Sequence, residues 1–171
     1  MTIVNDAGVN EQRVNDMRSA IEHRATWLYL LLDEAEKAGL PWEEFGRKAI
    51  TRCGVFHGST KFTKTEDLQA FAREFGNELY TKIFEMDVKE ATAERFEVHF
   101  HYCPLVAAWL RQTKDEKKIE TLCDIAMDGD RGIISAFPHL EFDLGETIAQ
   151  GGKVCKIVIT KVKAARQSRM L

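Results

Sequence analysis

Apolar residues recur at steps of three and four along most of the first half of the chain. This spacing is typical of amphipathic helices, because it places the apolar side chains on one side of the helix. It predicts a first helix from Asn10 to Gly39, a second from Pro41 to Gly54, and a third over residues 65–83. The apolar positions are Val14, Met17, Ile21, Ala25, Leu28, Leu32 and Ala35, then Phe45, Ala49 and Ile50, then Leu68, Phe71, Phe75, Leu79 and Ile83.

The pattern changes over residues 94–104, where apolar and polar residues alternate. Side chains of a strand point to opposite faces in turn. One face would carry Phe96, Val98, Phe100 and Tyr102, and the other Glu97, His99, His101 and Cys103. Pro104 should end the strand and begin a helix, since proline lacks a ladder N–H but fits the first helical turn. The sequence therefore predicts Cys103 at a corner between strand and helix.

The C-terminal half is predicted to hold two helices and two further strands. A short helix follows Pro104, and a longer one starts at residues 113–115 with apolar side chains that include Ile119, Leu122 and Cys123. Alternation at 140–144 and β-branched residues at 154–160 then predict an antiparallel pair. The fold class is therefore α+β, with N-terminal helices followed by a small antiparallel sheet packed on helices.

Length and local composition predict one domain with short extensions. The 171 residues are enough for one core that buries about 70% of the unfolded surface. Residues 1–9 are short and polar and are expected to be disordered, residues 10–163 to form a single α+β domain, and residues 164–171 to form a basic tail.

Composition and charge narrow the class of function. The formal net charge of -3 excludes an electrostatic nucleic-acid binder, which needs a concentrated basic face. No apolar run approaches the ~20 residues that cross a bilayer, and no secretory pattern precedes the first helix, so we expect a cytoplasmic protein without a membrane partner. The four cysteines form no C-x-x-C pair and should be free thiols.

The predicted strand carries the first group of candidate functional residues. His99 and His101 share a face with Cys103 and could bind a divalent metal together with a cysteine or a carboxylate, or could move a proton. The alternative is a solvent-facing polar strand that happens to contain two histidines. No other cofactor is indicated.

A second group lies on the long C-terminal helix. Cys123 and Asp130 are seven residues apart and point in nearly the same direction if the helix continues through Gly129. A carboxylate at the edge of an apolar stripe is partly desolvated, which raises its pKa and suits it to proton transfer. The alternative is an exposed cluster of Asp128, Asp130 and Arg131 at a fraying helix end. Periodicity alone places Cys155 in the core.

Three features of the C-terminal half resemble one family. They are Cys103-Pro104, then Leu122-Cys123 leading to Asp130, then the segment from Glu146 to Cys155, which reads E-T-I-A-Q-G-G-K-V-C. The chain resembles the L-2-amino-thiazoline-4-carboxylic acid hydrolase family over about residues 90–160. The terminal hairpin is more distantly similar to the small-molecule-binding domain of 4-vinyl reductases, which is related to vesicle-tethering subunits that bind acyl chains.

The resemblance implies an enzyme that opens the ring of a small cyclic amidine, such as 2-amino-thiazoline-4-carboxylate, by adding water. It implies that Cys103, Asp130 and Cys155 lie at or near the site. With it we assign Cys103, Asp130 and His101 to catalysis. We assign His99, Cys123, Thr147 and Cys155 to substrate binding. Where many members end in G-D-x-x-C-D-F, this chain reads G-G-K-V-C-K-I over residues 151–157 and loses two acidic groups, which suggests a different substrate.

Two mechanisms and one rival function remain open. In the first mechanism Cys103 attacks the ring carbon, His101 or His99 keeps its thiol ionised, and Asp130 handles protons. In the second, His99 and His101 hold a metal that activates water. The rival is a non-catalytic small-molecule-binding or sensory domain of the 4-vinyl-reductase type.

The predicted first helix also suggests a protein partner. Its middle, residues 27–32, reads W-L-Y-L-L-L and is apolar nearly all round. Such a segment must be covered on more than one side, so we expect a homodimer.

Overall fold

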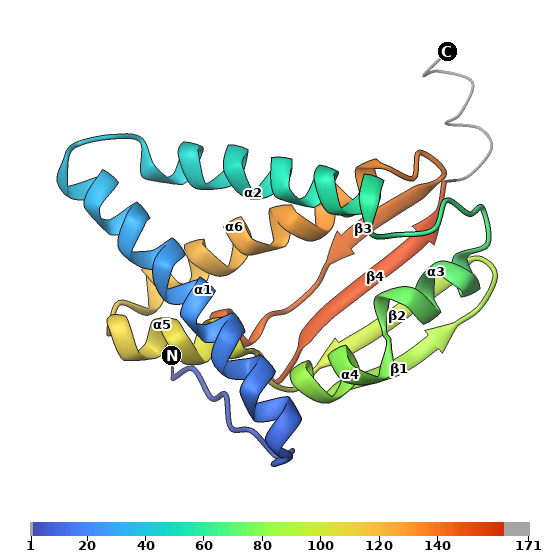
Figure 1. Cartoon of the computed structure of the whole chain (residues 1–171), viewed down its shortest axis with the longest axis horizontal. Coiled ribbons are helices and arrows are strands. Elements are labelled where there is room, and N and C mark those ends of the chain that lie inside the picture. Colours follow the sequence, from blue (N-terminus) through green and yellow to red (C-terminus); the bar gives the residue numbers. More distant parts are fainter. Residues whose placement is uncertain (1, 163–171) are drawn as a thin grey trace.

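The structure, a computed structural model, describes residues 2–162 and confirms the α+β fold class (Figure 1). The predicted basic tail at 164–171 lies outside the described residues. The elements are α1 (Gln12–Lys37), α2 (Trp42–Thr60), α3 (Leu68–Phe75), α4 (Glu78–Phe84), β1 (Met86–Ala91), β2 (Arg95–Phe100), α5 (Pro104–Gln112), α6 (Glu116–Ser135), β3 (Leu140–Leu144), the 3-10 turn η1 (Ile148–Gln150) and β4 (Cys155–Lys161). Within the described residues, no helix combines the length and the apolar character that a membrane span requires.

The four strands form one antiparallel sheet in the order β1-β2-β4-β3. On β2, Phe96, Val98 and Phe100 are buried, while the residues between them are only half-buried. Phe100 pairs directly with Cys155 at the start of β4, and paired residues share a face. The register therefore places Cys155 on the core face, as periodicity predicted.

Helices α2 and α6 pack side by side with their backbones in near contact (Figure 1). A Cβ atom on Gly54 would lie 2.1 Å from the carbonyl oxygen of Gly129, and one on Gly132 would lie 2.5 Å from that of Thr51. Only glycine permits this approach, because any side chain would clash with the opposite backbone. We predicted that α2 ends at Gly54, which is wrong: the helix continues to Thr60, and Gly54 is a packing residue.

Three other predicted boundaries are corrected. The predicted helix over 65–83 is two helices, since Asn77 caps α4 by accepting from the backbone N–H of Tyr80. The connection expected after it is strand β1. Strand β2 ends at Phe100 and not at Cys103, so Cys103 does not share the face of the histidines.

The N-terminal residues 2–9, which we expected to be disordered, contact the rest of the fold. The side chain of Asn5 donates to the Cys103 carbonyl at 2.9 Å and accepts from the Cys103 N–H at 2.8 Å. The N–H groups of Gly8 and Val9 donate to Glu85. Ile3 is buried in the main core. The segment therefore covers the corner at which β2 passes into α5.

We predict that Gly54→Ala lowers the free energy of unfolding by about 3 kcal/mol or more, because the new methyl group forces α2 away from α6. Gly129→Ala is the matched control on the same interface. Its Cβ would meet nothing closer than Ile50 Cγ2 at 3.5 Å, so the gain in helix propensity should leave it neutral or about 0.5 kcal/mol more stable. Urea denaturation of both variants measures this, and equal losses would contradict the close contact.

Candidate functional site

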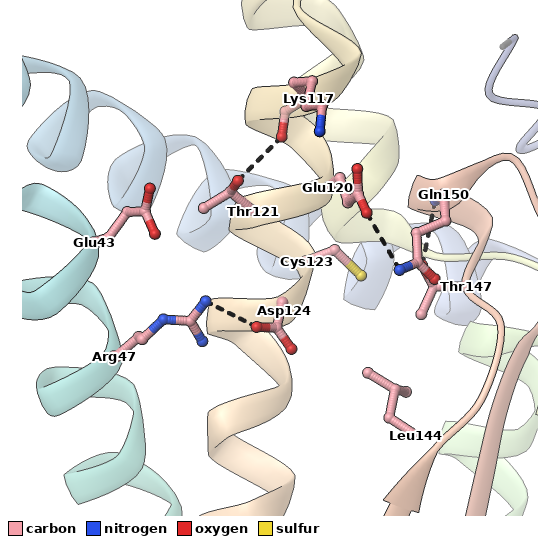
Figure 2. A pocket seen from close by; sticks show the side chains of 10 residues that line it. All are labelled: Glu43, Arg47, Lys117, Glu120, Thr121, Cys123, Asp124, Leu144, Thr147 and Gln150. Carbon is pink, nitrogen blue, oxygen red and sulfur yellow. Dashed lines mark hydrogen bonds and ion pairs between the residues drawn. The ribbon is translucent and has the colours of Figure 1, made fainter.

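A pocket of about 300 Å³ lies between the first turns of α2, one face of α6, and the connection from β3 to β4 (Figure 2). Its lining combines charged, polar and apolar side chains with one thiol. The lining residues are Glu43, Arg47, Lys117, Glu120, Thr121, Cys123, Asp124, Leu144, Thr147 and Gln150. This volume suits a small molecule rather than a polymer.

Arginine and aspartate side chains fix one wall of the pocket. Arg47 contacts Asp124 at 2.8 Å and Asp128 at 3.2 Å, and Arg131 contacts the same two carboxylates at 2.7 and 2.6 Å. Burial alone would raise the pKa of Asp124, but the hydrogen bonds from Arg131 and Arg47 lower it below its ordinary value. This four-residue network holds α2 against α6 beside the glycine contact.

On the opposite side of the pocket, the charged side chains form fewer contacts with other residues. Glu120 accepts a hydrogen bond from Gln150 Nε2 at 3.3 Å, which joins α6 to η1. Glu43 and Lys117 are exposed side chains, and neither forms an ion pair within residues 2–162. Both charges are therefore available to a bound molecule.

Two thiols lie where α6 approaches the sheet. The side chain of Cys123 lines the pocket and lies across from Thr147 (Figure 2). Cys155 belongs to the same buried core. The N–H of Ile148 donates to Cys155 Sγ at 3.3 Å. The neighbouring Cys123 thiol, and then the hydrogen bond from the Ile148 N–H, lower the pKa of Cys155 against the opposing effect of burial. The Cys155 thiol in turn raises the pKa of Cys123.

The turn η1 is what presents the Ile148 N–H to the sulfur. Thr147 caps it by accepting from the N–H of Gln150, and Gly151 ends it with φ 78°. A positive φ of this size favours glycine, so Gly151 of the sequence motif has a structural reason. The turn therefore positions both Thr147 and the Ile148 N–H.

Cys103 lies behind this pair and is buried. Burial raises its pKa to about 12, with a smaller contribution from Cys155, although the N–H groups of Leu105 and Val106 at the start of α5 oppose the shift. We predicted a lowered pKa from that helix start, which is wrong because desolvation outweighs it.

Asp130 lies within α6, because this helix continues past Gly129 to Ser135. Burial raises the pKa of its carboxyl to about 7, although Arg131 opposes this. Its charge acts on Cys103, so the two groups face the same interior, but neither lines the pocket. The alternative of a fraying, exposed helix end is wrong, because Asp128 is buried and paired.

The two histidines lie on the other face of the sheet, away from the three thiols. His99 pairs with Lys156, and its Nε2 lies 2.8 Å from Glu97 Oε1. The side chain of His101 is 46% exposed and lies 4.0 Å from Asp87. Hydrogen bonds from His99 and then Lys156 lower the pKa of Glu97 to about 2. Neither histidine is placed to ionise Cys103.

The proposed metal ligands also lack a third partner. Across residues 2–162, no three His, Cys, Asp or Glu side chains gather in a way that could hold a metal ion. The two histidines of the His-x-His motif therefore contact acidic side chains, His99 with Glu97 and His101 with Asp87.

Sequence reasoning missed most of the pocket walls. The missed residues are Glu43, Arg47, Lys117, Glu120, Thr121, Asp124, Leu144 and Gln150. A signal was present on α6, where positions 117, 120, 121 and 124 recur at helical spacing beside Cys123. The opposing face of α2 could not be assigned without knowing how the two helices pack.

Comparisons with known proteins extend the resemblance seen in the C-terminal half. The family model for L-2-amino-thiazoline-4-carboxylic acid hydrolase matches residues 18–159. Among solved structures, the chain is similar to trafficking protein particle complex subunit 3 from Naegleria fowleri, covalently bound to palmitic acid. The identity is 14%, the TM-score is 0.53, and the match covers 83% of this chain and 95% of that one, which shows a shared fold. No curated protein matches the chain.

We predict that Asp130→Asn reduces the pH dependence of stability. With its pKa raised from 3.8 to about 7, Asp130 keeps a proton in the folded protein that the unfolded chain releases, so stability falls as pH rises through this window. At pH 8 the variant should be more stable than wild type by about 2 kcal/mol, less than the full shift implies because Asp130 retains some exposure.

Urea denaturation at pH 5 and pH 8 measures this difference. Asp143→Asn, which replaces an exposed carboxyl on β3, should keep the wild-type dependence. A wild-type slope in Asp130→Asn would show that the carboxyl at 130 is ionised like any surface acid.

Proposed function

The chain belongs to the L-2-amino-thiazoline-4-carboxylic acid hydrolase family, and we propose that it opens the ring of a small cyclic amidine by hydrolysis. With 2-amino-thiazoline-4-carboxylate, water adds to the ring carbon between nitrogen and sulfur, the bond from that carbon to sulfur breaks, and N-carbamoyl-cysteine forms. The observation that carries the proposal is a thiol in the wall of a small pocket lined with both cations and anions.

The charges of the pocket fit such a substrate. A 2-amino-thiazoline-4-carboxylate carries a carboxylate at one end and an amidine that can be protonated at the other. Lys117 offers a cation that has no ion pair among the described side chains, and Glu43 and Glu120 offer carboxylates. A zwitterionic ring would thus meet a complementary charge at each end.

The chemistry needs a nucleophile, a proton for the departing sulfur, and stabilisation of a tetrahedral centre. The thiol cluster around Cys123 supplies the nucleophile, and the Ile148 N–H stabilises negative charge on sulfur. A carboxyl at Asp130 whose pKa is near 7 can exchange protons near neutral pH. Because Cys103 is buried behind the thiol cluster, it has only a supporting role. His101 is no longer part of the mechanism.

The lysine that replaces an acid near the end of the family motif does not argue for a different substrate. Lys156 lies on the outer face of the sheet, where its Nζ contacts Glu97 at 3.1 Å. Gly152, where the other acid is lost, does not line the pocket either. A carboxylate at 156 would not touch a molecule bound beside Cys123, so the ring substrate of the family remains our proposal.

A second candidate function is a small-molecule-binding or sensory domain without chemistry. It is favoured by the shared fold with a trafficking complex subunit that was solved with palmitic acid covalently bound. The polar lining of the pocket argues for the enzyme, because charged side chains would be poor partners for an acyl chain. The proposed reaction needs no cofactor. Free thiols in the protein are compatible with the reducing cytoplasm.

We also propose that the protein is a homodimer through α1. Trp27 and Leu31 lie one helical turn apart and are 63% and 69% exposed, and Leu30 beside them is 47% exposed. Such neighbouring apolar side chains on one helix are more often covered by a partner than left in water.

The reaction is tested by incubating the protein with 2-amino-thiazoline-4-carboxylate and measuring the free thiol and the carbamoyl product. Lys117→Ala should raise KM about tenfold with little change in kcat, since a charge-assisted contact to the carboxylate is lost in ground and transition state alike. Lys114→Ala, at an exposed position before α6 that is outside the pocket, should match wild type. Absence of product would reject the reaction, and an unchanged KM would reject the placement of the carboxylate.

The dimer is tested by light scattering and sedimentation at micromolar concentration. Replacing Trp27 and Leu31 together by serine should weaken association at least about 100-fold, because two large apolar side chains leave the interface. Val88→Ser removes an exposed apolar residue from β1 and should change nothing. A monomeric wild type would end this proposal without affecting the enzymatic one.

A further inference from the structure

Among the described residues, the pocket is lined by the carboxylates of Glu43, Glu120 and Asp124. These three side chains differ in how far other residues already occupy them. Asp124 is fully engaged, because its Oδ2 contacts Arg47 at 2.8 Å and its Oδ1 contacts Arg131 at 2.7 Å. A cationic ligand would have to displace one of these arginines, so Asp124 serves to hold the wall of the pocket together.

Glu43 lies in the first turn of α2, on the opposite wall from Cys123. A carboxylate in this turn stabilises the start of the helix through the helix dipole. Figure 2 shows Glu43 on the α2 side of the pocket, whereas the sulfur of Cys123 points away from α2 toward Thr147. An amidinium bound at Glu43 would therefore not face the thiol.

Glu120 is better placed, because it lies three residues before Cys123 on α6. Side chains at this spacing are neighbours on the helix surface, about 5–6 Å apart at Cβ. Figure 2 shows both side chains projecting toward η1. A ring whose amidine carbon faces Cys123 would thus have its nitrogens close to the Glu120 carboxylate.

A chain of hydrogen bonds holds Glu120 in this position. Gln150 Nε2 donates to Glu120 Oε1 at 3.3 Å, and the hydroxyl of Thr147 donates to Gln150 Oε1 at 3.2 Å. Thr147 is buried, so the chain starts from a fixed group. Glu120 Oε2 has no hydrogen-bond partner among residues 2–162. The carboxylate is therefore oriented through one oxygen and open to a ligand through the other.

We propose that Glu120 binds the amidine of the substrate and that Gln150 positions Glu120, so that the pocket selects a cationic ring. This inference rests on the proposed hydrolysis and names the contact that determines its specificity. It assigns the role to one of the two carboxylates that are free of ion pairs with arginine.

The chemistry of the two groups supports this selectivity. An amidinium carries a positive charge and N–H groups on both nitrogens, and a carboxylate accepts these as charge-assisted hydrogen bonds. A ring with a carbonyl oxygen in place of the amino group would present an acceptor to the same carboxylate. Two acceptors facing each other leave both unpaired, so the uncharged ring should bind less tightly.

Lys117 gives the bound ring its orientation. It lies three residues before Glu120 on the same helix, and within residues 2–162 the two side chains form no ion pair with each other. A zwitterionic ring could bridge them, with its carboxylate at Lys117 and its amidine at Glu120. Cation, anion and thiol thus follow one another along α6 at positions 117, 120 and 123.

Binding of two rings that differ in charge tests the proposal without turnover. 2-Amino-imidazoline-4-carboxylate is a cyclic guanidinium that resists hydrolysis, and 2-oxo-imidazolidine-4-carboxylate is the uncharged cyclic urea of the same size. Isothermal titration calorimetry on wild type at pH 7 should show the guanidinium binding at least about tenfold more tightly than the urea, as expected for a charge-assisted contact.

The variants assign this preference to a residue. In Glu120→Gln, which keeps the shape of the side chain but not its charge, the two rings should bind within about twofold of each other, and the urea should bind as in wild type. Gln150→Ala should reduce the preference about threefold, because Glu120 keeps its charge but loses its orientation. Glu43→Gln is the matched control from the opposite wall and should keep the wild-type preference.

Four results would overturn the assignment to Glu120: wild type that binds both rings equally or binds neither, an undiminished preference in Glu120→Gln, a Glu120→Gln variant that binds neither ring, or a preference that is lost in Glu43→Gln. An undiminished preference in Gln150→Ala would reject the positioning role of Gln150.

Turnover of 2-amino-thiazoline-4-carboxylate separates this proposal from the hydrolysis on which it rests. KM should rise at least about tenfold in Glu120→Gln and stay at the wild-type value in Glu43→Gln. Selective binding that depends on Glu120 without any turnover would reject the hydrolysis and keep the recognition site. Turnover with an unchanged KM in Glu120→Gln would keep the hydrolase and reject the role of Glu120.

Discussion

The close approach of the α2 and α6 backbones is the constraint on which the site depends. Gly54 and Gly132 bring the two helices together at a distance that no side chain at either position would allow. The same approach lets Arg47 of α2 reach Asp124 and Asp128 of α6. Helix packing by residues without a chemical role therefore builds one wall of the pocket. The charged side chains of that wall are held in place before a ligand binds.

The opposite side of α6 meets the sheet, which makes this helix the element that joins pocket and thiols. Cys123 projects from it into the pocket wall, and Cys155 of β4 lies in the same buried core. The turn η1 completes the arrangement by directing the Ile148 N–H at the second sulfur. A helix, a strand and a turn that are separate in sequence thus bring two buried thiols into one core. In such surroundings a hydrogen bond to sulfur changes its pKa strongly.

Local patterns predicted the elements better than their ends or their contacts. Periodicity identified α1, α5, α6 and β2, and the motif around Thr147 and Cys155 identified the family, because these signals are encoded in neighbouring residues. The glycine at 54 suggested a helix end, since sequence does not distinguish a glycine that stops a helix from one that packs against a second backbone. His99 and His101 were over-interpreted for a similar reason. Alternation separates the two faces of a strand but does not say which face meets the active pocket, and the early end of β2 put Cys103 on the core side.

The proposed function requires that ring chemistry takes place at the α6 pocket in front of Cys123. A crystal structure of Cys123→Ala with 2-amino-thiazoline-4-carboxylate bound tests it most directly. We predict that the ring lies between α2, α6 and η1, with its amidine carbon facing position 123 and its carboxylate toward Lys117. A ring bound on the outer face of the sheet beside His99, or an α6 pocket that stays empty at saturating substrate, would contradict it.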